Sequence, residues 1–224
     1  MPQGPAIFDR ALLRRRRQRA RTLGPETFLL DRAADDLGER LGAVLREFGT
    51  AVDLGTPTDA LRRAVAATGK VATLVRASQG GGANAGLHVI ADEEALPFGN
   101  GSLDLIVSVL ALHFVNDLPG TLIQARRALK PDGLLLAAML GGDTLSERRR
   151  TPLRRATLRR LAEIYAERFA DPDGRLRATF EIVWLSGWAP HESQQKPLKP
   201  GSASRRLADA LGAQEIPAGD KQRR

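Results

Sequence analysis

The chain has 224 residues, enough for one domain with a sizeable core, and 42% hydrophobic against 27% charged residues is an ordinary globular balance. It contains no cysteine, which excludes disulfides, thiolate metal sites and a cysteine nucleophile. The formal net charge is +8, with arginine clusters at 14–17, 148–150 and 205–206. Such clusters favour a solvated surface, with phosphates or an acidic protein partner as the alternative. Aromatic residues do not alternate with them, so nucleic acid stays a minor option.

No segment of the sequence predicts a membrane span or a targeting signal. The longest apolar stretch, residues 103–115, contains Asp104 and His113 and is too short to cross a bilayer. The basic N-terminal segment lacks the apolar run of a secretory signal, and Asp9 within it argues against a mitochondrial address. We therefore expect a soluble, cytoplasmic protein.

Residues 1–48 are predicted to form an N-terminal helical extension. Residues 7–21 have the pattern of a basic amphipathic helix. Residues 27–48 carry leucine and alanine near helical spacing, and Gly49 is suited to a left-handed cap at the end of that helix.

Residues 49–190 alternate between strand and helix patterns. Strands are expected at 50–54, 70–75, 87–90, 102–109 and 133–140, helices at 57–68 and 116–129, a glycine-rich loop at 79–86 and a turn at 130–133. The alternation implies right-handed crossovers and predicts an α/β, Rossmann-like, doubly wound and mostly parallel sheet.

The last third has a different pattern. Residues 152–169 predict a helix, and residues 178–185 alternate β-branched or aromatic side chains with others, as a strand does. Residues 191–224 are rich in Gln, Lys, Pro, Gly and Ser, so we expect a flexible tail.

The predicted sheet defines where a ligand would bind, because open parallel sheets bind ligands at the carboxyl ends of their strands. The segments there are 53–55, 91–98, 112–117 and 141–144. Each polar residue also has a structural interpretation: Asp53 as a turn cap, Asp92 as a solvated acid and His113 as a packed, hydrogen-bonded histidine. The three histidines show no metal-ligand spacing, so no metal site is expected.

Four segments, taken in order, resemble a class I S-adenosylmethionine-dependent methyltransferase of the type 11 kind. They run over Ala91–Phe98, Leu103–Ser108, Leu112–Asp117 and Leu129–Gly133. Three further segments, Phe8–Arg10, Gly141–Leu145 and Ala178–Gln195, are similar to two branches of that family. One branch is the methyltransferase-related complex I assembly factors, which hydroxylate an arginine; the other is the biotin-synthesis enzymes that methylate the malonyl carrier protein.

The resemblance implies S-adenosylmethionine as cofactor and gives roles to matching residues. Asp53 and Gly55 would lie under its methionine part, and Asp92, with Glu93 adjacent, would accept from the adenine amino group. Ser78 could replace one hydrogen bond to the ribose. His113 and Phe114 would border the adenine and the sulfonium, and Asp143 would face the substrate side. His113 and Asp143 are the candidate catalytic residues.

Two departures from the family pattern weaken that expectation. The family's glycine loop reads acid-x-Gly-x-Gly-x-Gly, and this chain has Pro57 and Asp59 in place of the second and third glycines. Pro57 removes one backbone NH, and Asp59 adds a carboxylate near the carboxylate of the cofactor. The second strand ends without the acid that would hold the ribose, so cofactor binding is predicted to be weak or lost. A lid and one strand are missing near 148–152, and a final strand antiparallel to the fifth would become an exposed edge.

Three functions remain open on this evidence. The chain could transfer a methyl group to a small-molecule or protein acceptor, with positioning providing most of the catalysis. It could be a non-catalytic assembly or interaction protein that has kept the fold. It could be a hydroxylase-like assembly factor of respiratory complex I.

Overall fold

The computed structural model describes residues 7–24, 26–80, 86–142, 154–172 and 179–194. The chain forms two compact units, Met1–Pro190 and His191–Arg224, and the sheet lies in the first. Of the predicted tail at 191–224, only residues 191–194 are among those described, so its flexibility stays a prediction.

A six-stranded sheet with the order β3-β2-β1-β4-β5-β6 organises the first unit. The first five strands are parallel and β6 is antiparallel to β5. The bounds are β1 Phe48–Leu54, β2 Val71–Ser78, β3 His88–Ile90, β4 Leu103–Val109, β5 Leu129–Leu140 and β6 Ile182–Trp188. The strand order reverses between β1 and β4, which confirms the predicted Rossmann-like doubly wound sheet with an antiparallel edge strand.

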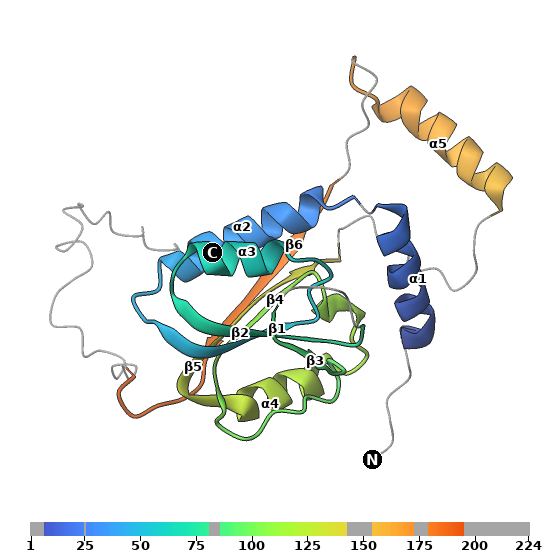
Figure 1. Cartoon of the computed structure of the whole chain (residues 1–224). Helices are drawn as coiled ribbons and strands as arrows, with labels where there is room; N and C mark the ends of the chain where they lie inside the picture. Colours follow the sequence, from blue (N-terminus) through green and yellow to red (C-terminus); the bar gives the residue numbers. More distant parts are fainter. Residues whose placement is uncertain (1–6, 25, 81–85, 143–153, 173–178, 195–224) are drawn as a thin grey trace, which may run out of the picture. The chain divides into compact units, whose positions relative to one another are not determined.

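Helices cover both faces of the sheet (Figure 1). Helices α2 (Phe28–Gly42) and α3 (Ala60–Ala67) pack on one face through fully buried side chains such as Leu37, Leu41 and Leu61. Helix α4 (Leu118–Ala128) covers the other face, where Ala125 packs in a second core. All seven residues of β4 are buried, as expected for a central parallel strand covered on both sides.

Two helices of the first unit bury none of their described residues. Helix α1 (Arg10–Leu23) begins at Asp9, whose side chain accepts a hydrogen bond from the NH of Leu12 as an N-cap. Helix α5 (Arg155–Phe169) follows residues 143–153, which lie outside the described part.

The predicted helix at 27–48 is wrong in its last third. Helix α2 ends at Gly42, and Phe48 already belongs to β1, with its NH donating to the carbonyl of Lys70 at 2.8 Å. The side chain of Phe48 is 1% exposed. Gly49 is therefore a strand residue and caps no helix, because burial of Phe48 in the sheet core outweighs the local helical pattern.

The C-terminal half of the sheet differs from the prediction at two places. The expected turn at 130–133 is an irregularity inside β5, where Asp132 has a φ of 62° and the register with β4 shifts. The last strand begins at Ile182, later than the predicted 178, and pairs from Ile182 with Leu140 to Trp188 with Leu134.

Candidate functional site

A cleft of about 960 Å³ lies at the carboxyl end of the sheet, beneath α1. Its lining comes from α1, the start of α2, the loop after β1, and the ends of β2, β4 and β5. This is the size of pocket that takes a cofactor-sized ligand. Among the predicted residues, those that line it are Gly55, Ser78, His113 and Phe114.

The loop after β1 depends on a glycine at position 55. Gly55 has a φ of 75°, and its NH donates to the carbonyl of Ala77 at 2.8 Å. A Cβ at this position would lie 2.7 Å from Oε1 of Glu93 and 3.1 Å from the Cβ of Ala111. Both the positive φ and the close approach therefore require glycine here.

The acidic loop after β3 is bound by one arginine of α1. Arg10 contacts Asp92 at 2.6 Å, Glu93 at 2.5 Å and Glu94 at 3.0 Å. Glu93 is buried and also accepts from Nε2 of Gln79 at 3.0 Å. Asp92 keeps 39% of its side chain exposed, but neither Asp92 nor Glu93 is among the residues that line the large cleft.

Aromatic side chains close the opposite side of the cleft. The short helix η1 (Leu112–Phe114) after β4 places the rings of His113 and Phe114 4.1 Å apart. Phe8 meets Phe114 edge to face at 5.9 Å, and the guanidinium of Arg17 lies 5.2 Å from the ring centre of Phe114. The rings of His113 and Phe114 are tilted by 45° to one another and give this part of the cleft an apolar surface.

Leu110, between β4 and η1, has a φ of 50°, a conformation that a branched side chain rarely adopts. Its NH still pairs with the carbonyl of Ala138 at 2.8 Å, and it lines the cleft. Unfavourable backbone conformations of this kind concentrate at ligand-binding sites.

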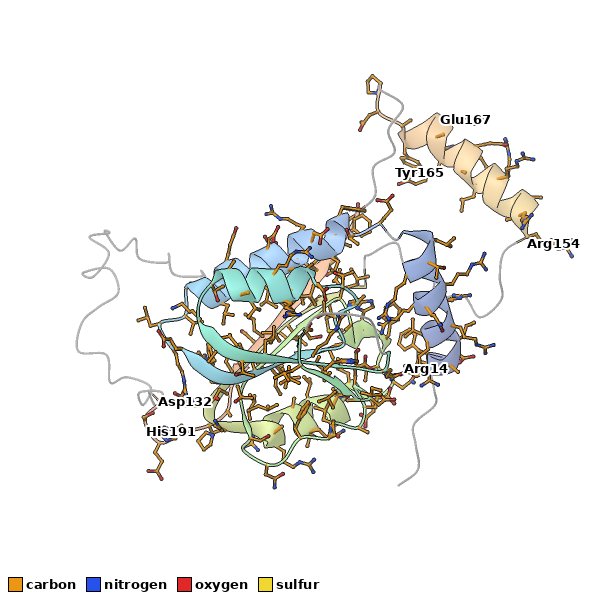
Figure 2. The ribbon with its side chains drawn as sticks, viewed as in Figure 1. Arg14, Asp132, Arg154, Tyr165, Glu167 and His191 are labelled. Atoms are coloured by element: carbon orange, nitrogen blue, oxygen red, sulfur yellow. The ribbon has the colours of Figure 1, made fainter. Side chains whose placement is uncertain are left out.

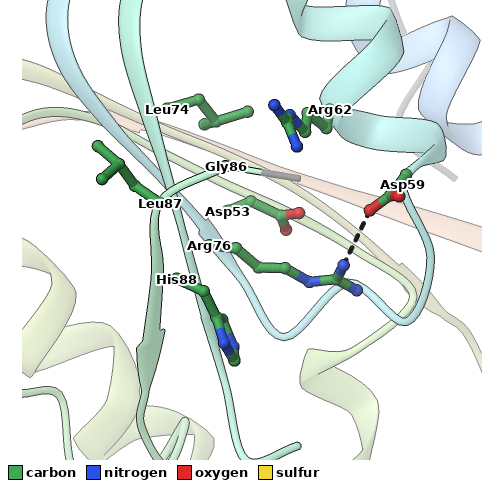
Figure 3. A pocket seen from close by; sticks show the side chains of 8 residues that line it. All are labelled: Asp53, Asp59, Arg62, Leu74, Arg76, Gly86, Leu87 and His88. Atoms are coloured by element: carbon green, nitrogen blue, oxygen red, sulfur yellow. Dashed lines mark hydrogen bonds and ion pairs between the residues drawn. The ribbon is translucent and has the colours of Figure 1, made fainter. Parts of the chain in front are cut away.

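A second, much smaller pocket lies on the α3 side of β1 and β2 (Figure 3). It holds the side chains of Asp53, Asp59 and Arg76, with His88 nearby. Arg76 pairs with Asp59 at 3.0 Å and donates to the carbonyl of Thr56 at 2.6 Å. The carboxylate of Asp59, expected to repel a cofactor carboxylate, is therefore bound to a cation.

Asp53 is buried, with 2% of its surface exposed, and no hydrogen-bond partner within the described chain reaches its Oδ1 atom. Burial raises the pKa of Asp53 from 3.8 to about 7, opposed by hydrogen bonds from Thr56 and the charge of Arg76. Asp53 lines the small pocket and not the large cleft. Its predicted place under the methionine part of the cofactor stays a prediction.

The residues present can be compared with what S-adenosylmethionine needs. The turn at Gly55, the tilted rings of His113 and Phe114 and the exposed part of Asp92 suit an adenosyl group. The ribose side has fewer groups for hydrogen bonding to a ligand, since the Ser78 hydroxyl already contacts His88 at 3.1 Å and the carbonyl of Gly80 at 3.2 Å. The residues therefore fit the adenine end of the cofactor and offer few free groups for its ribose.

Three residues contribute to the site although the sequence did not predict it, and one predicted site residue cannot be located. Arg17 was predicted to belong to a solvated arginine cluster, Gln79 to a glycine-rich loop and Asn116 to a helix. The side chain of Asn116 accepts from the NH groups of Ile7 and Phe8, both at 2.7 Å, and so fixes the start of α1. Asp143, a candidate catalytic residue, lies outside the described residues.

The sheet order, the glycine loop and the acidic loop define a class of protein. Residues 52–137 match the family model described as "Methyltransferase domain". This segment is therefore similar to a methyltransferase domain, as the sequence motifs predict.

Particular relatives extend the match beyond that domain. The mitochondrial arginine-hydroxylase NDUFAF5 of Danio rerio is 28% identical over 289 aligned positions, covering 92% of this chain and 90% of the relative. The human protein of the same name is 28% identical over 91% of this chain and 83% of its own. The alignment with the Danio protein is longer than this chain, so that relative contains sequence without a counterpart here; the predicted join at 148–152 lies outside the described residues.

Other matches cover less. The malonyl-[acyl-carrier protein] O-methyltransferase of Gallionella capsiferriformans is 51% identical over 63 residues, which is 28% of this chain and 22% of the relative. A solved complex of the Haloferax volcanii Trm112 methyltransferase activator with a methyltransferase is 26% identical, with a TM-score of 0.43 over 49% of this chain and 53% of that one. The chain thus spans about half of that solved structure.

The predicted cytoplasmic location is wrong, because the relatives that match over most of this chain are named as mitochondrial proteins. The prediction relied on Asp9 within the basic N-terminal segment. Asp9 is the N-cap of α1 and so serves the folded domain, which makes it no guide to targeting. No helix in the described ranges is long and apolar enough to span a membrane, and their side chains provide no cluster able to hold a metal ion.

Proposed function

We propose that this chain is an S-adenosylmethionine-dependent methyltransferase and that the cleft beneath α1 holds the cofactor. The observation that carries the proposal is the convergence on one cleft of the Gly55 turn and the rings of His113 and Phe114. When bound, the cofactor supplies an electrophilic methyl group. The acceptor is a small molecule or a protein group that reaches the cleft.

In this proposal the residues of the site bind the cofactor or orient it. The Gly55 turn brings the backbone close to the ligand, Asp92 accepts from the adenine amino group, and Phe114 with His113 covers the adenine. Glu93 accepts at its Oε2 atom from Arg10 and Gln79, so it holds the acidic loop against α1. Methyl transfer from a sulfonium needs alignment more than proton transfer, which suits a site of this kind.

Thermal unfolding in the presence of S-adenosylmethionine tests the proposal. A ligand at a hundred times its Kd adds about 2.7 kcal/mol to the free energy of unfolding, which raises Tm measurably. Asp92→Asn should abolish the shift, whereas Asp35→Asn, an exposed acid of α2, should leave it unchanged. A melting curve that does not respond to millimolar cofactor would favour the non-catalytic interaction protein.

A second candidate is arginine hydroxylation, favoured by the name of the relatives that cover about nine-tenths of this chain. Mass spectrometry of an arginine-containing peptide after incubation with enzyme and cofactor separates the two reactions. A methyl group adds carbon and hydrogen, whereas a hydroxyl group adds one oxygen. An added oxygen that needs dioxygen and a reductant would replace methyl transfer as the function.

A further inference from the structure

One face of α1 brings a row of arginines to the cleft. Arg14, Arg15, Arg17 and Arg21 all line it, and three of them follow the spacing i, i+3 and i+7 that places side chains on one side of a helix. Arg14, which is labelled on α1 in Figure 2, donates to the side chain of Gln79 at 3.0 Å. The only carboxylate among the described lining residues is Glu26.

The other acids near α1 lie outside the cleft lining, and their three negative charges exceed the single positive charge that binds them. Asp92, Glu93 and Glu94 share the guanidinium of Arg10, which does not line the cleft. The lining therefore carries four positive charges against one negative charge. Such an excess inside a concave, partly apolar cleft concentrates anions there.

Arg17 is the most constrained member of the row. Its Nη2 atom is buried and has no hydrogen-bond partner among the described residues. Glu93, the nearest acid, is 3.9 Å from Nη1 and already accepts from Arg10 and Gln79. Burial lowers the pKa of Arg17, opposed by the charge of Glu93. A guanidinium that has a buried donor without a partner is costly unless a ligand oxygen completes its hydrogen bonds.

We propose that the α1 face of the cleft is a binding subsite for an anionic group, a carboxylate or a phosphate, carried by the second ligand of the site and held by Arg17, Arg21 and Arg15. The planar, multi-donor guanidinium suits both groups. The term "second ligand" rests on the proposed function, in which the first ligand is the cofactor.

The charge of the cofactor also favours an anionic second ligand. S-adenosylmethionine carries a sulfonium and an ammonium against one carboxylate, so it adds positive charge to a cleft that already has an excess. An anionic co-ligand compensates that charge, whereas a free arginine side chain as acceptor would add to the repulsion. The subsite therefore favours an acidic acceptor over an arginine.

The test uses the full chain and two probes, inorganic phosphate and succinate, each titrated at constant ionic strength against sodium chloride while Tm is followed. We expect a saturable rise in Tm with at least one probe, and the more effective probe identifies phosphate or carboxylate as the group recognised. Arg17→Gln should weaken that binding at least tenfold. Arg15→Gln with Arg21→Gln, both exposed positions, provides a second variant that keeps Arg17 and should weaken binding several-fold.

Arg126→Gln with Arg127→Gln on α4 is the charge-matched control, since both side chains are exposed and neither lines the cleft. Equal weakening by the α1 and α4 variants, or no saturable response to either probe, would overturn the subsite. Tighter binding of a short oligonucleotide, lost equally with any arginine of α1, would overturn it too. Titrating S-adenosylmethionine alone separates the two proposals, because cofactor binding without anion binding refutes only the subsite and the reverse result refutes only the cofactor.

Discussion

Arg76 of β2 lies 3.0 Å from Asp59, the residue that begins α3, and its second nitrogen donates to the carbonyl of Thr56 at 2.6 Å. The pair joins the end of the second strand to the loop after the first. The loop lacks the later glycines of the family pattern, and Pro57 within it removes an NH. An ion pair across the loop therefore holds a segment whose conformation the sequence no longer sets through glycine.

A double-mutant cycle on this pair should show coupling of about 1 kcal/mol, since Arg76 is 11% exposed and Asp59 38% exposed. Arg76→Gln should cost more than Asp59→Asn, because it leaves both Asp53 and Asp59 without their cation. Urea unfolding of the three variants measures the coupling. Additive effects of the two substitutions would show that the pair does not stabilise the loop.

Gly55→Ala should destabilise the fold by about 1–3 kcal/mol and abolish cofactor binding, because the added Cβ combines a positive φ with a clash against Glu93. Gly69→Ala is a matched control, since Gly69 has a similar φ of 66° and nothing lies within 4 Å of its Cβ position. It should cost only about 1 kcal/mol and leave binding intact. Equal losses in the two variants would mean that the clash is unimportant.

Much of the sheet could be predicted from the sequence because parallel strands buried on both faces have a simple signature. The run from Leu103 to Val109 is continuously apolar apart from Asp104 and Ser108, and it is the central strand β4. The end of α2 could not be predicted in this way. Residues up to Phe48 keep a helical pattern, and only the pairing of Phe48 with Lys70 makes it a strand residue.

The site was predictable as a set of loops but not as a set of contacts. Strand ends in a parallel sheet must lie together, so the grouping of Gly55, Ser78 and His113 follows from topology. Nothing in the sequence indicates that Arg76 points towards Asp59 or that Arg10 joins three consecutive acids. Such pairings depend on the distance between segments far apart in the chain, which composition and periodicity do not contain.

Asp104 should be a major stabilising residue at neutral pH. Its carboxylate accepts from the NH of Thr50 at 2.9 Å and pairs with Lys130 at 3.0 Å, joining β1, β4 and β5. Burial alone would raise the pKa of Asp104, but the Thr50 and Lys130 contacts outweigh it and lower that pKa below 3.8. Asp104→Ala should cost about 2–3 kcal/mol at pH 7, since it leaves the Thr50 NH without a partner.

The acid sensitivity of that contribution has a defined sign. Because the folded-state pKa of Asp104 lies below its ordinary value, its stabilisation is present at neutral pH and is lost as the pH falls below 3.8 through the folded value. The difference between wild type and Asp104→Ala, measured by urea unfolding, should therefore shrink in acid. Lys130→Ala, at a side chain 43% exposed, should cost only about 0.5 kcal/mol. A difference that stays constant with pH would show that the charge of Asp104 is not what stabilises the sheet.

Asp53 should give the opposite pH dependence. Its pKa in the folded protein is about 7 against an ordinary value of 3.8, so the folded state holds the proton more tightly than the unfolded chain. The free energy of unfolding should then fall by about 1.4 kcal/mol per pH unit between about pH 4 and pH 7, and level off above the folded pKa. Asp53→Asn removes the titrating group and should remove this slope. The free energy of unfolding of the variant, relative to that of the wild type, should therefore increase as the pH rises. Urea unfolding at a series of pH values measures both proteins, with Asp35→Asn on α2 as the exposed control; parallel curves for wild type and Asp53→Asn would mean that Asp53 is ionised in the folded protein throughout this range.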